Sequence, residues 1–298
     1  GVYAPDRVLA VTFAGKAAAE MQGRLRGLGA EGVRAQTFHG AALAQLGFFW
    51  PQLVGGPAPQ VLSGGKVSLL SQAADSLRLT LPAETLRDVA AEIEWRKVSM
   101  LGLEGYAALM ERGAEGGGAD DAGELPGSRR AVPAGVTLEQ LLELQEAYGR
   151  LLDERRQIDF EDVLILATGM LETEPRAAMQ VRERYRFFTV DEYQDVSPLQ
   201  HALLRVWLGD RDDVCVVGDA SQTIYSFAGA SSSYLLRFAS EHPNAREFRL
   251  ERNYRSLEPV VRVANRLMRG RPGALTLRAV REEGAGERGN ARSAVGPS

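Results

Sequence analysis

Short apolar runs alternate with longer amphipathic stretches near both ends of this chain. The runs are four to six residues long and rich in β-branched or aromatic side chains, which is typical of strands in a buried sheet. The expected strands are residues 8–13, 33–37, 187–190, 214–217 and 246–250, and the expected helices between them are residues 16–28, 38–46, 198–208, 234–240 and 258–269. Because strands alternate with helices, the pattern predicts a parallel α/β sheet.

The middle of the chain has a different pattern. Between about residues 64 and 156, apolar positions recur at helical spacing only, and the expected helices are residues 67–81, 82–97, 105–112 and 138–156. The stretch 113–127 is rich in glycine and acid, and we expect an exposed loop there. The pattern predicts an all-helical subdomain inserted between two halves of one sheet. The expected division is therefore residues 1–63 and 157–245 for the first α/β domain, 64–156 for the insertion, and 246–298 for the beginning of a second α/β domain.

Composition narrows the class of protein. A chain of 298 residues with 45% hydrophobic and 25% charged residues is ordinary for a globular protein of about two domains, which excludes a wholly disordered or fibrous chain. We expect no membrane-spanning helix, because no run of about 18 uncharged apolar residues exists. The single cysteine, Cys215, excludes internal disulfides and a cysteine-rich zinc site, and it favours a cytoplasmic location. We interpret Cys215 as a small core residue of its strand.

Charge is unevenly distributed along the chain. The whole chain has a net charge of −4, yet residues 246–298 contain 12 arginines and 6 acidic residues. Two interpretations of this basic segment remain open. It is either a solvated charged face or a patch that contacts phosphate groups.

Polar and aromatic clusters follow the expected strands. In parallel α/β sheets, ligands bind beyond the carboxyl ends of the strands, so these clusters are candidates for one shared site. The clusters are residues 12–13, 37–39, 191–192, 218–219 and 253–255.

The adjacent carboxylates Asp191 and Glu192 carry the clearest chemistry. In a magnesium–nucleotide site, the first carboxylate of such a pair can hold the metal, and the second can orient or deprotonate an attacking water. The alternative for a bare pair is an acidic strand end that faces solvent. The whole string of residues 187–195, an apolar strand that ends in these acids, favours the nucleotide site.

Six motifs in consistent order resemble those of superfamily 1 DNA helicases of the UvrD/Rep/PcrA type. Residues 12–21 resemble motif Ia, 37–39 motif Ib, 159–164 the acidic motif after the helical insertion, 190–195 the Walker B motif, 217–230 motif III and 250–256 motif IV. The resemblance covers most of the chain. It implies a RecA-like parallel sheet of the P-loop NTPase type, an inserted helical subdomain (1B) within the first motor domain (1A), and a truncated second motor domain (2A).

The resemblance also implies residue roles in a nucleotide site. Asp191 would bind Mg²⁺ and Glu192 would activate water. Gln222 would contact the γ-phosphate, and Arg255 would stabilise charge on the transferring phosphoryl group. Tyr254 would stack on the adenine of ATP.

A second group of residues is implied to contact single-stranded DNA. Aromatic rings would stack on the bases, and hydroxyl and imidazole groups would meet the backbone. For Phe160 a core position is the alternative, and for His39 a helix-start position. The implied DNA contacts are Phe13, Phe160, Tyr225 and Phe227 for the bases, and Thr12, Thr37 and His39 for the backbone.

The implied activity is ATP-dependent translocation on single-stranded DNA with unwinding at duplex junctions. The resemblance implies 3′-to-5′ polarity, ATP and Mg²⁺ as cofactors, and a role in DNA repair or replication restart. Two alternatives remain open. One is a catalytically dead DNA-binding remnant or regulatory module, and the other is the motor part of a helicase–nuclease.

The phosphate-binding motif G-x-x-x-x-G-K-[ST] does not occur in this sequence. Gly15–Lys16 is followed by Ala17, and Gly65–Lys66 is followed by Val67, so neither pair qualifies. We therefore expect a fragment that lacks the Walker A motif and the late C-terminal motifs of the family. We also expect this chain alone to hydrolyse ATP negligibly.

Overall fold

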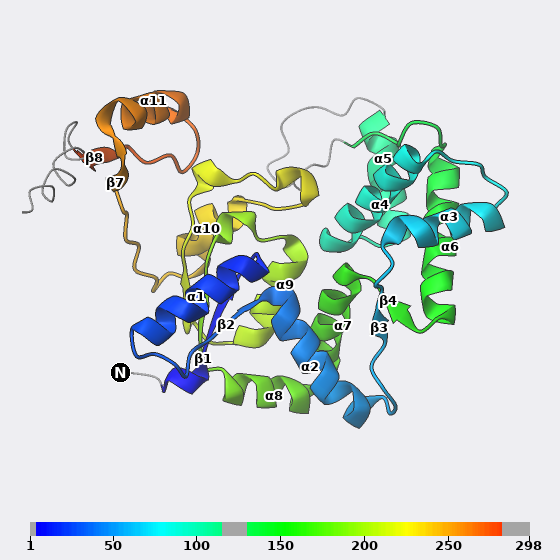
Figure 1. Ribbon diagram of the computed structural model, residues 1–298, viewed down its shortest axis with the longest axis horizontal. Helices are drawn as coiled ribbons and strands as arrows, with labels where there is room; N and C mark the ends of the chain where they lie inside the picture. The colour runs from blue at the N-terminus through cyan, green and yellow to red at the C-terminus, as the bar shows by residue number, and fades with distance from the viewer. Residues whose placement is uncertain (1–3, 115–129, 282–298) are drawn as a thin grey trace, which may run out of the picture. The chain divides into compact units, whose positions relative to one another are not determined.

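The computed structural model describes residues 4–114 and 130–281 (Figure 1). Contacts divide the chain into two units: unit 1 comprises Gly1–Gly218 and Thr223–Tyr234, and unit 2 comprises Asp219–Gln222 and Leu235–Ser298. Most of the expected loop 113–127, and the last part of the expected segment 246–298, lie outside the described residues. Within the described ranges, no helix combines the length and the hydropathy that a bilayer span requires.

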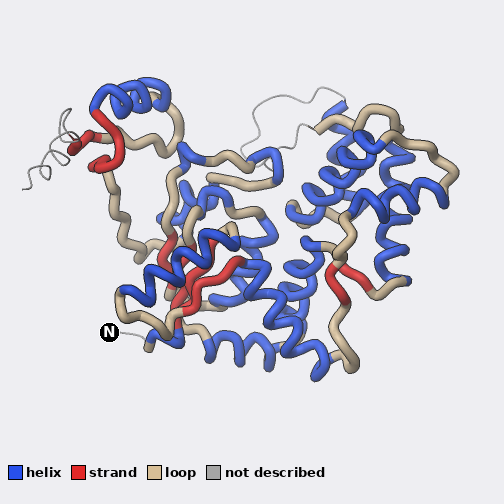
Figure 2. Tube along the Cα trace, in the orientation of Figure 1, coloured by secondary structure: helices blue, strands red, loops and turns tan. Residues whose placement is uncertain are grey.

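A four-stranded parallel sheet is the centre of unit 1, as the alternating pattern predicts (Figure 2). Its strands are β1 (Val8–Thr12), β2 (Arg34–Thr37), β5 (Phe187–Val190) and β6 (Val214–Val216), in the order β2-β1-β5-β6. Val11 of β1 lies opposite Val190 of β5. Since the two strands are parallel and in this register, their carboxyl ends lie side by side.

Five helices of unit 1 follow or precede these strands: α1 (Gly15–Gly27), α2 (Phe38–Leu53), α7 (Phe160–Thr173), α8 (Pro175–Arg184) and α9 (Pro198–Leu208). Helix α9 has the expected bounds, because Ser197 accepts the Gln200 N–H in a capping box and proline occupies the first position. Helix α2 continues beyond the expected end at residue 46. Aromatic packing joins these helices to the sheet: the ring of Trp207 stacks on Phe38 and on Phe188, with centroids 5.8 and 5.7 Å apart.

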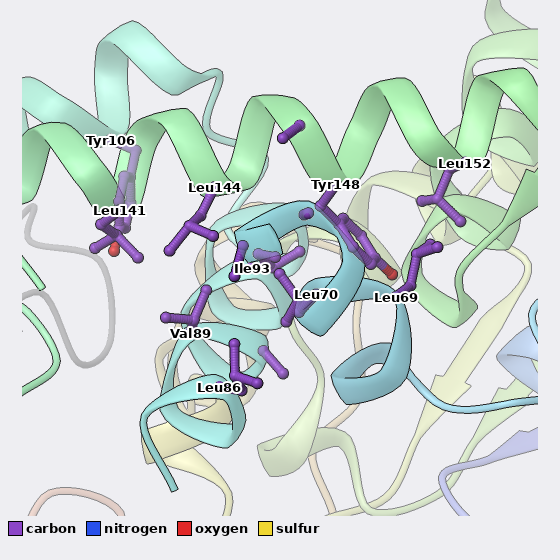
Figure 3. Close-up of a cluster of buried hydrophobic side chains, with 14 of the residues drawn as sticks. Leu69, Leu70, Leu86, Val89, Ile93, Tyr106, Leu141, Leu144, Tyr148 and Leu152 are labelled. Atoms are coloured by element: carbon purple, nitrogen blue, oxygen red, sulfur yellow. The ribbon is translucent and has the colours of Figure 1, made fainter. Parts of the chain in front are cut away.

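The expected helices of the middle segment are present: α3 (Lys66–Ser76), α4 (Ala83–Val98), α5 (Leu103–Ala114) and α6 (Leu138–Glu154). They pack around their own hydrophobic cluster, in which Leu70, Ile93, Leu141 and Tyr148 are buried (Figure 3). Two short parallel strands, β3 (Gln60–Val61) and β4 (Gln157–Ile158), pair where the chain enters and leaves these helices. Two-residue strands are too short to produce a periodic signal, and the sequence did not predict them.

Unit 2 is described by itself. Its strands β7 (Arg252–Leu257) and β8 (Arg278–Arg281) are parallel and are connected through α11 (Glu258–Met268), while α10 (Ser233–Glu241) lies at the transition between the units. The predicted strand of residues 246–250 is wrong. A strand needs a hydrogen-bonded neighbour, and the ladder forms between β7 and β8. Residues 253–255 therefore lie within β7 instead of following a strand.

The interpretation of Cys215 as a core residue is also wrong, because its side chain is exposed. Strand β6 has a single neighbour in the described sheet, β5, whereas β1 and β5 have neighbours on both sides. A strand at the edge of a sheet is less covered than a central one. Val217, just beyond β6, is likewise exposed.

Candidate functional site

Asp191 and Glu192 lie at the carboxyl end of β5, between the ends of the two neighbouring strands. The Asp191 N–H donates to the Val11 carbonyl of β1 at 2.9 Å, and the Tyr193 N–H donates to the Val217 carbonyl after β6 at 2.9 Å. Burial raises the pKa of Asp191, and the charge of Glu192 raises it further. The sheet thus fixes the backbone of the acidic pair on both sides.

Glu192 has a left-handed backbone conformation, with φ 53° and ψ 40°. For a residue with a Cβ this conformation costs roughly 1–2 kcal/mol, and such strain is concentrated at functional sites. It turns the chain into the 3-10 helix η2 (Tyr193–Asp195) and leaves the Glu192 side chain exposed. Its carboxylate accepts a hydrogen bond from the Gln194 amide at 2.8 Å. The carboxylate is therefore oriented yet accessible to a water molecule.

The chemistry of this pair fits Mg²⁺. Mg²⁺ in nucleotide sites is held through one or two carboxylates together with waters and phosphate oxygens. Within the described residues, no three histidine, cysteine or acidic side chains cluster as a metal cage would require. Asp191, with Glu192 beside it, accordingly suits an ion that shares its coordination with phosphate.

Asp195, at the end of η2, connects the acidic pair to a distant loop. The Gln194 amide that donates to Glu192 also lies 3.3 Å from the Asp195 carboxylate. Asp195 in turn accepts the N–H groups of Ile224, at 3.3 Å, and of Tyr225. Burial raises the pKa of Asp195, and these N–H donors oppose that rise. Sequence analysis did not single out Asp195, although it closes the Walker B-like string.

Tyr225 and Phe227, in the loop held by Asp195, form an aromatic row with Phe13, which directly follows β1. The Phe13 and Tyr225 rings stack with centroids 4.9 Å apart and planes at 23°, and Tyr225 lies 6.2 Å from Phe227. Phe13 is 40% and Phe227 69% exposed. Phe13 and Phe227, the two exposed rings of the row, are suited to stacking on nucleic-acid bases.

A second aromatic pair consists of His39, on α2, and Phe160, the first residue of α7. Their rings stack with centroids 3.7 Å apart and planes at 11°. Phe160 is 54% exposed, which contradicts the alternative that it is a core residue. Burial, together with the charge of Lys66, lowers the pKa of His39 to about 4, so the imidazole is neutral at pH 7.

Thr12 is placed differently from the expectation that it meets a DNA backbone, whereas the backbone contact expected of Thr37 stays a prediction. Thr12 is only 1% exposed, and its hydroxyl is buried without a hydrogen-bond partner. As the last residue of β1, a strand with neighbours on both sides, it is covered and offers no surface contact. The Thr37 hydroxyl caps α2 by accepting the Gly40 N–H at 3.0 Å.

Two partly buried lysines secure the beginning of α7, a feature that sequence analysis missed. Lys97, at the end of α4, donates to Asp159 and to Asp162, each at 2.7 Å, and these two acids form the capping box of α7. Burial opposes the ionisation of Asp159, but Lys97 and Lys66 outweigh it, and the pKa of Asp159 is lowered. Lys66 pairs with Glu161 in the same way. Phe160 therefore projects from a helix start that is fixed on both sides.

Gln222, Tyr254 and Arg255 belong to unit 2. The Gln222 amide donates to Asp219 at 2.9 Å. Tyr254 and Arg255 are exposed on β7, where the Asn253 side chain accepts the Arg255 N–H at 3.0 Å. Because these residues and Asp191 belong to different units, their convergence around one nucleotide stays a prediction.

Comparison with known proteins agrees with the motifs. A sequence profile of the UvrD/REP helicase N-terminal domain matches residues 1–243. ATP-dependent DNA helicase UvrD2 of Mycobacterium tuberculosis (strain ATCC 25618 / H37Rv) is 41% identical over 292 residues, which cover 93% of this chain and 39% of that protein. UvrD1 of the same strain is 30% identical over 301 residues, covering 94% and 35%. PcrA of Leuconostoc citreum is 27% identical over 268 residues, covering 88% and 32%.

The chain thus spans 39% of the length of UvrD2 and less of the other two relatives. The profile match extends over β1 to α10, the region that contains both the acidic pair and the aromatic row. By this match, and by its identity to UvrD2, the chain belongs to the UvrD/REP helicase family.

Proposed function

We propose that the full-length gene product containing this chain is an ATP-dependent translocase on single-stranded DNA that unwinds duplexes at junctions. The observation that carries this proposal is the hydrogen-bonded path from Glu192 through Gln194 and Asp195 to the loop of Tyr225. The path joins a candidate hydrolytic carboxylate to an exposed stacking surface within one unit. A motor needs such a link between the two sites. The family resemblance adds 3′-to-5′ polarity and a role in DNA repair or replication restart.

On the nucleotide side, Asp191 is proposed to hold Mg²⁺, and Glu192 to accept the proton of the attacking water. When bound, Mg²⁺ supplies positive charge that stabilises the phosphate groups. Gln222 and Arg255 are proposed to contact the terminal phosphate, and Tyr254 to stack on adenine. We also propose that these 298 residues alone hydrolyse ATP negligibly, since they contain no G-x-x-x-x-G-K-[ST] motif.

On the DNA side, the aromatic row and Phe160 are proposed to stack on bases, and Thr37 and His39 to meet the DNA backbone. Base–aromatic stacking contributes about 1–3 kcal/mol per base and tolerates any sequence, as a translocase requires. The proposed organisation keeps the division into a RecA-like domain (1–63 and 157–245), an inserted helical subdomain (64–156) and the beginning of a second motor domain (246–298).

The second candidate function is a DNA-binding module without catalysis. The missing phosphate-binding motif favours it for this chain taken alone. The two functions share the DNA surface and differ only in ATP turnover, so one series of measurements separates them.

The first experiment measures binding of a fluorescein-labelled oligo-dT to the 298-residue chain by anisotropy. We expect single-stranded DNA to bind more tightly than duplex, and Phe13→Ala to weaken binding by roughly tenfold, from the stacking energy of one base. Phe48→Ala is the matched control, since Phe48 is also exposed but lies on α2 outside the aromatic row. Equal effects of the two substitutions would refute the proposed DNA surface.

The second experiment measures DNA-stimulated ATP hydrolysis by the full-length gene product. Glu192→Gln should abolish turnover while ATP binding, measured with a fluorescent analogue, is retained. Turnover unchanged by Glu192→Gln would refute its role as the base. DNA binding without any ATP turnover in the wild-type protein would establish the second candidate function.

A further inference from the structure

The loop that ends the aromatic row rests on helix α4. The 3-10 helix η4 (Ser226–Ala228) is followed by Gly229, which has a φ of 90°. A Cβ on Gly229 would lie 2.8 Å from Cγ2 of Val98, at the end of α4, so the backbone approaches that helix as closely as glycine allows. The position of Phe227 therefore depends on the helices of the middle segment.

Arg130 is anchored in that helical segment beside α4. Its Nε donates to the two carboxylate oxygens of Glu92 at 2.8 and 2.9 Å, and its guanidinium lies 4.8 Å from the ring centroid of Trp95. Glu92 is only 6% exposed and also accepts the Tyr106 hydroxyl at 2.7 Å. A forked ion pair and a ring contact together hold the guanidinium plane in one orientation.

The third nitrogen of the guanidinium, Nη1, contacts the aromatic row. Nη1 of Arg130 donates to the backbone carbonyl of Phe227 at 3.3 Å. Arg130 thus fixes the backbone of Phe227, while the Phe227 ring stays 69% exposed. An arrangement that served burial would hold the ring, whereas this one presents the ring to solvent.

We propose that Arg130 is a positioning residue for single-stranded DNA, acting through the backbone of Phe227. The proposal rests on the proposed function, because it assigns a role to a residue that supports the same DNA surface. Lysine cannot replace arginine here. A single ammonium can pair with Glu92, but it lacks the planar fork that reaches Glu92, Trp95 and the Phe227 carbonyl at once.

A double-mutant cycle tests the proposal by anisotropy with labelled oligo-dT and the whole 298-residue chain. Phe227→Ala should weaken binding by about tenfold. Arg130→Lys should weaken it by roughly threefold to tenfold, and the double variant should bind no more weakly than Phe227→Ala alone. Arg96→Lys is the matched control, because Arg96 also bonds a buried side chain, Gln145, in the helical segment. It should leave binding unchanged.

The outcomes separate a positioning role of Arg130 from a direct contact with DNA and from no role at all. An Arg130→Lys loss that persists in the Phe227→Ala background would show that Arg130 acts on DNA directly, and an absent loss would show no positioning role; both overturn the proposal. If Phe227→Ala itself has no effect, the proposed DNA surface fails instead. Should Arg130→Lys not fold, the double substitution Glu92→Gln/Arg130→Met removes both charges of the ion pair together. The amide oxygen at position 92 then still accepts the Tyr106 hydroxyl. The same cycle with Phe227→Ala then applies.

Discussion

Replacing Lys97 with methionine removes a positive charge from between two carboxylates and keeps a side chain of similar length. The Lys97 amine lies 2.7 Å from both Asp159 and Asp162, and Asp159 is only 1% exposed. Removing one partner of a buried ion pair typically costs about 3–5 kcal/mol, because the other charge stays buried and unpaired. Asp162 is less buried and can retain some hydration. We therefore expect the free energy of unfolding of unit 1 to fall by about 3 kcal/mol.

Urea unfolding followed by tryptophan fluorescence measures this loss. The chain has three tryptophans, Trp50, Trp95 and Trp207, and all of them belong to unit 1. Lys16→Met is the matched control, since Lys16 is exposed on α1, and its effect should stay within about 0.5 kcal/mol. A loss for Lys97→Met no larger than the control's would refute the reasoning that this ion cluster secures the start of α7.

The pH dependence of the same variant provides an independent check. In the wild type the pKa of Asp159 is lowered, so its contribution is present above the unfolded pKa and is lost as pH falls through the folded pKa. Without Lys97, burial dominates and favours the protonated acid. The stability difference between Lys97→Met and the wild type should therefore shrink as the pH is lowered from 7 towards 4. A difference that is constant over this range would contradict the ion-pair explanation.

Three further predictions concern single residues of the site. Because the pKa of His39 is lowered to about 4, stability that is present above pH 6.5 is lost as the pH falls towards 4. Between pH 7 and pH 5 this loss amounts to about 2 kcal/mol in urea unfolding, and His39→Gln should lack it; an identical slope in the variant would contradict the assignment. Asp195→Asn, measured by coupled ATPase assay of the full-length gene product, should reduce stimulation of turnover by oligo-dT roughly tenfold with ATP binding intact, since charge-assisted bonds to the loop are weakened. Arg255→Ala should lower turnover by roughly 10³-fold and ATP affinity much less, and a loss confined to affinity would count against a role on the transferring phosphoryl group.

Features encoded by neighbouring residues could be predicted from the sequence. The strand of residues 187–190 is apolar throughout and ends at two acids, so both β5 and the candidate nucleotide carboxylates were predicted. Ser197 followed by Pro198 supplies a complete helix start, and α9 begins there. Phe227 was expected to stack on bases, which requires an accessible ring, and it is 69% exposed.

Features that depend on distant partners could not be predicted in this way. The strand β7 forms where β8 pairs with it, and the pattern of residues 246–250 contains no information about that partner. The burial of Thr12 and the exposure of Cys215 depend on which strands lie beside them in the sheet. Arg130 reaches Phe227 from 97 positions away in the sequence, so no local motif marks it.

The left-handed backbone of Glu192 has a consequence for the evolution of this segment. Glycine adopts that conformation at no steric cost, so Glu192→Gly would relax the turn even as it deletes the carboxylate. If Glu192 acts as the proposed base, backbone strain and chemistry favour opposite residues at position 192, and the turn tolerates its strain because the carboxylate is needed there.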